Sequence, residues 1–219
     1  MMNPAEILYW LSQNRSERIV ATSSFQAQSL PLLFLLNKII PMTPILFLDT
    51  GFHFRETLAY IDDIQNQLGL NIKMLQPKQR TQHKNLYKTN PDMCCYLSKV
   101  EPLQEELKHY DVWISGIRRD QTSARRNTPI IGRDNRNKII KLCPMLNATR
   151  EVIDSMNEQL DLPLNPLLRM GYRSVGCQPC TKIPTNANER SGRWQGTDKT
   201  ECGLHITSPN DKSRNNYHL

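Results

Sequence analysis

The sequence has no apolar run long enough to cross a membrane. A bilayer span needs about 20 consecutive apolar residues, whereas the longest apolar block, Leu30 to Ile40, is interrupted by Pro31 and Asn37. The segment 1–14 contains Glu6 and no lysine or arginine, so it lacks the basic start of a secretion signal. We therefore expect a cytoplasmic protein with no membrane contact.

Internal repeats are also absent, and the composition is that of one folded domain. The 219 residues are 38% hydrophobic with a mean hydropathy of −0.56, which excludes a disordered chain and allows one sizeable core. Lysine and arginine number 28 against 21 acidic residues, a net charge of +7. This excess suits an anionic ligand, either a phosphate ester or a nucleic acid, although charge alone favours the simpler interpretation of a solvated surface.

No disulfide framework is indicated for the six cysteines. A reducing cytoplasm keeps thiols free, and the adjacency of Cys94 and Cys95 would strain a mutual disulfide. Six thiols in this compartment are better explained as metal ligands, one reactive thiol and one buried spare.

Short apolar segments alternate with helical patterns along most of the chain. Ile45–Leu48 is a continuous apolar run, typical of a strand buried on both faces. Gly69 is placed to end one helix, and Thr149 to begin another as its N-cap. The expected strands are 18–22, 45–48, 70–75, 112–115 and 138–142, and the expected helices are 5–12, 29–40, 54–68, 100–109 and 149–159. This alternation predicts an α/β fold with a mostly parallel sheet and helices on both faces.

Polar turns follow three of the expected strands. They are Ser23-Ser24, Asp49-Thr50-Gly51 and Gly116-Ile117-Arg118-Arg119. Because ligands of parallel sheets bind beyond the carboxyl ends of the strands, we expect these turns to meet at one crevice.

Two pairs of cysteines stand far apart: Cys94 with Cys95, and Cys177 with Cys180 in a CxxC turn. Four thiolates can complete a zinc site or a cubane iron–sulfur cluster. Adjacent cysteines do not easily point at one small ion, whereas a cluster offers each a separate iron, so we favour the cluster. Zinc, and ordinary buried thiols with a redox CxxC, stay as alternatives. Lys99 would share a helix face with Cys95 and offset thiolate charge; a solvated lysine is the simpler alternative.

Cys202 differs from the other cysteines because it lies in a polar, glycine-containing segment near lysine and histidine. An exposed thiol near cations ionises readily, and the thiolate is the attacking form. We therefore treat Cys202 as a candidate nucleophile, with a tolerated surface cysteine as the alternative. Arg190, Arg193 and Trp194 form a basic and aromatic group upstream.

The chain resembles the assimilatory adenylyl-sulfate and phosphoadenylyl-sulfate reductases, which have an adenine nucleotide alpha-hydrolase-like fold. The resemblance extends from about Ile19 to His205. It rests on six motifs in order: Ser23-Ser24-Phe25-Gln26-Ala27-Gln28, Leu48-Asp49-Thr50-Gly51, Cys94-Cys95, Gly116-Ile117-Arg118-Arg119-Asp120-Gln121, Cys177-Gln178-Pro179-Cys180 and Glu201-Cys202-Gly203-Leu204-His205.

The resemblance implies a role for each matching residue. Ser23 and Ser24 belong to a modified phosphate loop, and the backbones of Leu48 and Gly116 hold the adenine. The expected further substrate-binding residues are Arg118, Arg119, Arg126 or its neighbour Arg125, Arg190 and Arg193. The expected catalytic residues are Cys202, Lys99 and His205, and the expected ligands of a [4Fe–4S] cluster are Cys94, Cys95, Cys177 and Cys180.

The resemblance also implies a reaction and its partners. Adenylyl sulfate would be cleaved to AMP and sulfite through an S-sulfocysteine on Cys202, resolved by thioredoxin or glutaredoxin. Residues 1–189 would bind the nucleotide and the cluster, and residues 190–219 would form a mobile segment carrying Cys202. We expect no nucleic-acid partner, and homo-oligomerisation is left open. Cys143 is interpreted as the buried spare.

Three other functions are considered. Phosphoadenylyl sulfate is the near alternative as substrate. An ATP-dependent tRNA-thiolating enzyme would need paired glycines in the phosphate loop, which Ser23–Gln28 lacks. A metal-bound nucleic-acid module would suit the net charge of +7, but the basic residues are not gathered in one run.

Overall fold

The computed structural model describes residues 3–14, 18–78, 85–186 and 188–204. In this part of the chain a single six-stranded sheet has the strand order β3-β2-β1-β4-β6-β5. The strands are β1 (Ile19–Thr22), β2 (Ile45–Leu48), β3 (Ile72–Leu75), β4 (Val112–Ser115), β5 (Ile131–Asp134) and β6 (Ile139–Leu142). All neighbouring pairs are parallel except β5 with β6 at one edge.

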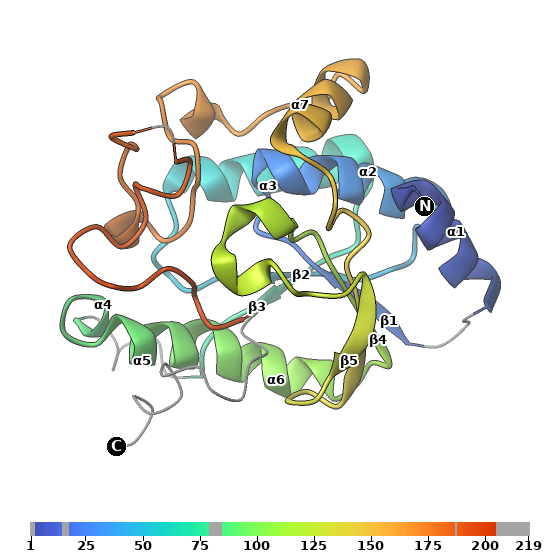
Figure 1. The fold of residues 1–219 in the computed structure, drawn as a ribbon, viewed down its shortest axis with the longest axis horizontal. Helices are drawn as coiled ribbons and strands as arrows, with labels where there is room; N and C mark the ends of the chain where they lie inside the picture. The colour runs from blue at the N-terminus through green and yellow to red at the C-terminus, as the bar shows by residue number, and fades with distance from the viewer. Residues whose placement is uncertain (1–2, 15–17, 79–84, 187, 205–219) are drawn as a thin grey trace.

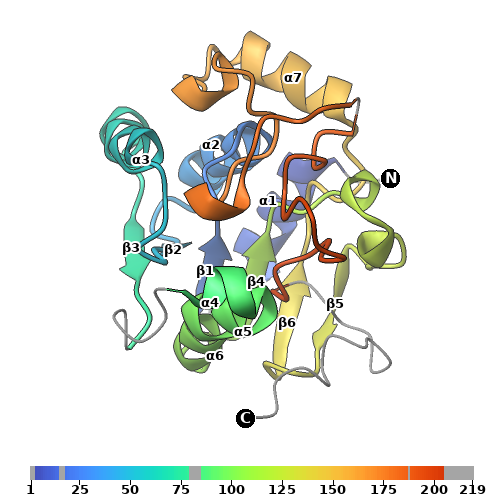
Figure 2. The same ribbon diagram turned by 90° about the vertical axis from the view of Figure 1, so that its left-hand side faces the viewer.

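Helices cover both faces of this sheet, as the sequence predicts (Figures 1 and 2). One face carries α1 (Pro4–Asn14), α2 (Leu30–Ile39), α3 (Arg55–Leu68) and α7 (Arg150–Gln159). The other carries α4 (Leu86–Thr89), α5 (Pro91–Cys95) and α6 (Glu101–Leu107). None of the described helices is long and apolar enough to span a bilayer.

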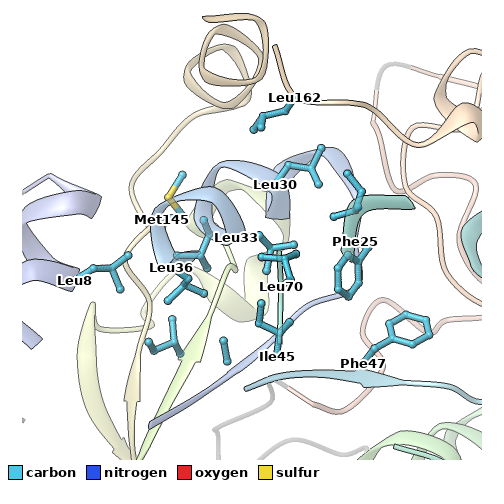
Figure 3. Packing of buried hydrophobic residues seen from close by; sticks show 14 of the residues in the cluster. Leu8, Phe25, Leu30, Leu33, Leu36, Ile45, Phe47, Leu70, Met145 and Leu162 are labelled. Atoms are coloured by element: carbon cyan, nitrogen blue, oxygen red, sulfur yellow. The ribbon is translucent and has the colours of Figure 1, made fainter. Parts of the chain in front are cut away.

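Two apolar clusters attach these helices to the sheet. The larger joins α1, α2, α3 and α7 to the strands through residues such as Leu33, Ile45 and Met145 (Figure 3). The smaller packs Leu103 of α6 against Trp113 on the opposite face. Every residue of β2 and β4 is buried, because these strands have helices above and below them.

The strand order reverses between β1 and β4, since the chain builds outward from β1 to β3 and then crosses to β4. This point leaves a crevice at the carboxyl ends of two neighbouring strands, the usual ligand position in open parallel sheets. The turns after β1 and β4 open directly onto it.

Both predicted helix caps are confirmed. Gly69 ends α3 with a φ of 62°, in the left-handed region that favours glycine. The side chain of Thr149 accepts a hydrogen bond from the Val152 N–H at the start of α7.

Two elements differ from the prediction. Strand β5 was not predicted, because Ile131-Gly132-Arg133-Asp134 contains one large apolar residue, which is exposed, and no apolar–polar alternation. The helical stretch predicted from Val100 begins earlier: α5 starts at Pro91 and continues into α6 through a π-helical turn at Tyr96–Val100. The cysteine pair 94–95 therefore lies on a helix.

Candidate active site

A pocket occupies the crevice between β1 and β4. It encloses about 980 Å³, counting its open mouth. The turns after β1 and β4 line it, together with the last residues of β2. Four residues predicted to bind substrate are among the lining: Ser23, Ser24, Leu48 and Gly116. The expected convergence on one crevice is thus confirmed for Ser23-Ser24 and Gly116-Ile117, whereas Asp49-Thr50-Gly51 does not line the pocket.

The conformation of the turn after β1 is stabilised by its own side chains. Phe25 has a φ of 52°, an unfavourable value for a bulky residue, and its fully buried ring packs edge-on against Phe47. Ser23 Oγ accepts a hydrogen bond from the Phe25 N–H at 3.0 Å, and Gln26 Nε2 donates to Ser24 Oγ at 3.0 Å. Both serines thereby face the pocket in a defined loop.

All four paired cysteines line a second, smaller cavity. Cys94 and Cys95 reach it from α5, and Cys177 and Cys180 from a short 3₁₀ turn at Gln178–Cys180. The sequence places these pairs more than eighty residues apart, and the fold brings them together.

The turn after β2 holds the second cysteine pair in place. The backbones of His53 and Cys177 form an isolated β-bridge. The Gln178 N–H donates to the Phe52 carbonyl at 2.7 Å, and Thr50 Oγ1 lies 3.2 Å from Cys177 Sγ. Asp49–Gly51, predicted as a pocket turn, therefore supports the cysteine cavity instead, and Thr50 lines that cavity.

Three residues separate the two cavities, because Lys99, Arg193 and Trp194 line both. All three are buried. The Arg193 guanidinium carbon stands 4.5 Å from the centroid of the Trp194 ring, a cation–π distance. Gly176 backs this guanidinium, and a Cβ at that position would collide with it.

Charge in this wall is balanced between Lys99 and the thiols. Burial by itself disfavours the charge on Lys99, but the neighbouring sulfur groups of Cys177, Cys95 and Cys202 outweigh it and raise the lysine pKa. Burial would likewise raise the pKa of Cys177, yet Lys99 and the Thr50 hydroxyl lower it below the usual value for a thiol. Lys99 and Cys177 thus each favour the charged form of the other.

The other three thiols of the cavity are less acidic. Burial raises the pKa of Cys94 to about 11 and that of Cys95 to about 12. The pKa of Cys180 is raised by burial and by the charge of Cys177. Such thiols ionise at neutral pH only when a metal takes the place of the proton.

The four-cysteine donor set suits a cluster better than one ion. Among the described residues, no three side chains of His, Cys, Asp or Glu are grouped closely enough to hold a single metal ion. Tetrahedral zinc needs that convergence. Thiolates spread around one cavity can instead each bind a different iron of a cluster, and their soft sulfur chemistry fits such a group.

Cys202 reaches the pocket from the carboxyl-terminal segment, which is orange to red in Figures 1 and 2. It is half-buried and lines the same pocket as Lys99, Arg190 and Arg193. Arg190 Nε and Trp194 Nε1 are buried there without a hydrogen-bond partner among the described residues. Unpaired buried donors are costly, and an anionic ligand would satisfy them.

The remaining predicted arginines lie elsewhere. Arg118, Arg119 and Arg126 line a separate groove beside α7. Arg118 pairs with Asp120 and Glu189, and Arg119 donates to the Arg126 carbonyl. Arg125, the alternative to Arg126, lines the pocket between β1 and β4 instead. His205 lies outside the described residues.

The sequence did not single out Glu201, although it belongs to the motif around Cys202. Its carboxylate is buried against Arg125 and Thr122. Nothing in the local sequence shows this, because the partners are more than seventy residues away.

Fold and pocket together define the class of protein: an α/β protein of the adenine nucleotide alpha-hydrolase-like type whose switch-point pocket adjoins a four-cysteine cavity. Residues 18–183 match the model of the phosphoadenosine phosphosulfate reductase domain. The chain belongs to this family.

The names of similar proteins agree with this family assignment. An adenosine 5'-phosphosulfate reductase of Staphylococcus epidermidis is 41% identical, over 92% of this chain and 86% of its own length. One of Shouchella clausii is 40% identical, over 94% and 89%. The crystal structure of a phosphoadenylyl-sulfate reductase from Candida auris, in a phosphate complex, superposes with a TM-score of 0.74 at 25% identity, over 83% of this chain and 91% of that one.

The environments of Cys143 and Cys202 predict very different reactivity. Cys143 is fully buried, and burial raises its pKa to about 11, whereas Cys202 is half-exposed in an open pocket. We expect iodoacetamide at pH 8 to alkylate Cys202 at least about a hundredfold faster, because only accessible thiolate reacts. Peptide mass spectrometry measures both rates in one sample, and comparable rates would contradict the assignment of Cys143 as a buried spare.

Proposed function

We propose that this chain is an assimilatory adenylyl-sulfate reductase, a cytoplasmic oxidoreductase that forms sulfite and AMP. The observation that carries the proposal is the position of Cys202, in one pocket with Lys99, Arg190 and Arg193. Both bacterial relatives described above bear the name adenosine 5'-phosphosulfate reductase. All six cysteines are free thiols, which agrees with a reducing compartment.

In this proposal the turns at the carboxyl ends of the strands bind the nucleotide. Ser23 and Ser24, in the loop after β1, would bind the phosphate of the nucleotide. The backbones of Leu48 and Gly116 would flank the adenine. Arg125 replaces Arg126 as the arginine near the nucleotide, because it is the one that lines the pocket.

The cationic wall binds the phosphosulfate group. Lys99, Arg190 and Arg193 supply positive charge at the wall of the pocket, where their partial or full burial makes charge–charge interactions stronger than in water. The unpaired Nε of Arg190 and Nε1 of Trp194 would donate to substrate oxygens. His205 is proposed as a further donor from the same segment.

The first chemical step transfers the sulfo group. The thiolate of Cys202 attacks the sulfur atom of adenylyl sulfate, an S–S bond forms, and the bond from sulfur to the bridging oxygen breaks. AMP leaves with the electron pair of that bond. The cations of the wall stabilise the charge that accumulates on the departing phosphate.

The second step reduces the sulfur. A thiolate of thioredoxin or glutaredoxin attacks Cys202 Sγ and releases sulfite, and the partner's second thiol then frees Cys202 as the partner becomes a disulfide. Cys202 must meet a protein dithiol for this, so the described residues 190–204 are proposed to move as a unit separate from residues 1–189.

Cys94, Cys95, Cys177 and Cys180 would hold a [4Fe–4S] cluster. Their thiolate chemistry and their common cavity support this, and Lys99 would offset part of the negative charge. The bound cluster would supply fixed charge next to the pocket rather than electrons for the reaction. Lys99 lines both cavities, so its positive charge would act on the cluster and on the substrate.

The test of the proposal is the sulfonated intermediate. Mixing the anaerobically purified protein with adenylyl sulfate, without reductant, should add one sulfonate to Cys202, seen by peptide mass spectrometry. Cys202→Ser should lose the adduct and at least about a thousandfold in rate, because the nucleophile is gone. Cys143→Ser, the matched control, should keep the adduct on Cys202. Turnover of Cys202→Ser at the wild-type rate would refute the mechanism.

Substitution of a proposed cluster ligand should change the iron content of the protein, whereas substitution of Cys202 should not. Cys177→Ser should lower the iron content and the brown absorbance of the purified protein, because serine is a poor ligand for iron in such a cluster. Cys202→Ser should keep both. A colourless, iron-free wild-type protein with full activity would contradict the cluster.

The near alternative is phosphoadenylyl sulfate, favoured by the likeness to the Candida auris enzyme. We expect kcat/KM to be at least about tenfold higher for adenylyl sulfate. Among the described cations of the pocket, Arg125 is already paired with Glu201, which leaves less charge for a 3'-phosphate. Steady-state kinetics with the two nucleotides measures the ratio, and a preference for the phosphorylated form would reverse the substrate assignment.

A further inference from the structure

The segment that carries Cys202 is held at four points, on both sides of the thiol. Before it, Lys199 Nζ contacts Asp92 of α5, and Arg190 Nη2 donates to the Thr200 carbonyl at 3.0 Å. After it, Arg136 Nη2 donates to the carbonyls of residues 203 and 204 at 3.0 and 3.1 Å. The fourth point is Glu201, directly next to the nucleophile.

Glu201 has the most specific of these contacts. Arg125 donates to it through Nε at 2.7 Å and Nη2 at 2.9 Å, and Thr122 Oγ1 donates at 2.7 Å. Arg190 Nη2 stands 3.6 Å from its second oxygen. A two-pronged arginine–carboxylate pair fixes both distance and direction, unlike a single contact to a flexible lysine.

The position of this carboxylate is unusual for a pocket that is to bind an anion. Glu201 is 5% exposed and lines the pocket together with Cys202. An uncompensated carboxylate there would repel a phosphosulfate and carry a large desolvation cost. The arginine pair neutralises the charge, so what Glu201 adds to the pocket is geometry rather than charge.

We infer that Glu201 is the positioning residue for the Cys202 nucleophile, holding the thiol over the pocket through its buried contacts with Arg125 and Thr122. The inference rests on the proposed role of Cys202. Glu201 touches no reacting atom. It sets the place and direction of the next residue in the chain.

A substitution at Thr122 can weaken the buried contacts of Glu201 without changing a residue that lines the pocket. Its hydroxyl bonds Glu201, but the residue is not part of the pocket lining. Thr122→Val removes one hydrogen bond to the carboxylate and leaves the arginine pair, whereas Glu201→Gln removes the charge of the pair and keeps the shape of the side chain.

The experiment compares Glu201→Gln and Thr122→Val with the wild-type holoenzyme. The first readout is the alkylation rate of Cys202 by iodoacetamide without nucleotide, taken at the high-pH plateau where ionisation of the thiol no longer limits the rate. We expect about a tenfold rise in Glu201→Gln and a smaller rise in Thr122→Val, because release of the segment exposes the thiol. Glu158→Gln, at an exposed site on α7, is the matched control and should leave the rate unchanged.

The second readout is single-turnover formation of the sulfonate on Cys202. Glu201→Gln should slow it about tenfold or more, with iron content within twofold of the wild type and with AMP bound at least as tightly, because Arg125 keeps its charge and loses its carboxylate partner. Glu201→Asp, which keeps the charge, should restore part of the rate. A residue with a merely structural role would lower AMP affinity or iron content together with the rate.

Wild-type values of both readouts in Glu201→Gln would overturn the inference. If that variant does not fold, a wild-type alkylation plateau in Thr122→Val overturns it instead. If the wild-type protein forms no sulfonate on Cys202, the proposed function is refuted. If Glu201→Gln and Thr122→Val are nevertheless alkylated faster than the wild type, the positioning contact is supported. The two failures are therefore distinguishable.

Discussion

The site depends on one buried lysine among thiols. Lys99 lies in the wall between the switch-point pocket and the cysteine cavity, and the neighbouring Cys177, Cys95 and Cys202 raise its pKa in spite of burial. An isolated buried ammonium would be neutralised. Because these cysteines come from α5, from the turn at Gln178–Cys180 and from the carboxyl-terminal segment, the charge of Lys99 depends on elements that are far apart in the chain.

The residues around Cys202 are attached to the rest of the chain mainly by polar contacts. These are ion pairs and hydrogen bonds through Lys199, Glu201 and the carbonyls near Leu204. Leu204 adds one apolar contact to the smaller cluster. The proposed release of Cys202 to a second protein would exchange these polar contacts for contacts with water.

The positive charge of the chain serves two purposes. Arg190 and Arg193 line the pocket, where they are stacked near the ring of Trp194. Arg118 and Arg150 instead pair with Glu189 and fasten the loop after β4 to α7. A net charge of +7 therefore says little about ligand binding until each arginine is located.

Much of the fold could be predicted from the sequence because the signals were local. The apolar run at Ile45–Leu48, the capping positions of Gly69 and Thr149 and the alternation of elements were each read from a few neighbouring residues. The exposed edge strand β5 and the π-helical turn at Tyr96–Val100 gave no such signal, because their conformation depends on strand pairing and on packing against the cysteine cavity.

The sequence by itself determined which residue types are present for the chemistry: two cysteine pairs, one remote cysteine and a set of arginines and lysines in recognisable motifs. Only the tertiary structure decided which of them share a cavity. It placed Arg125 rather than Arg126 in the pocket, put Lys99 between two cavities and joined Glu201 to partners far away in the chain. The physical reason is that these assignments depend on distances and burial across separate elements, and neither quantity is encoded in the spacing of residues along the chain.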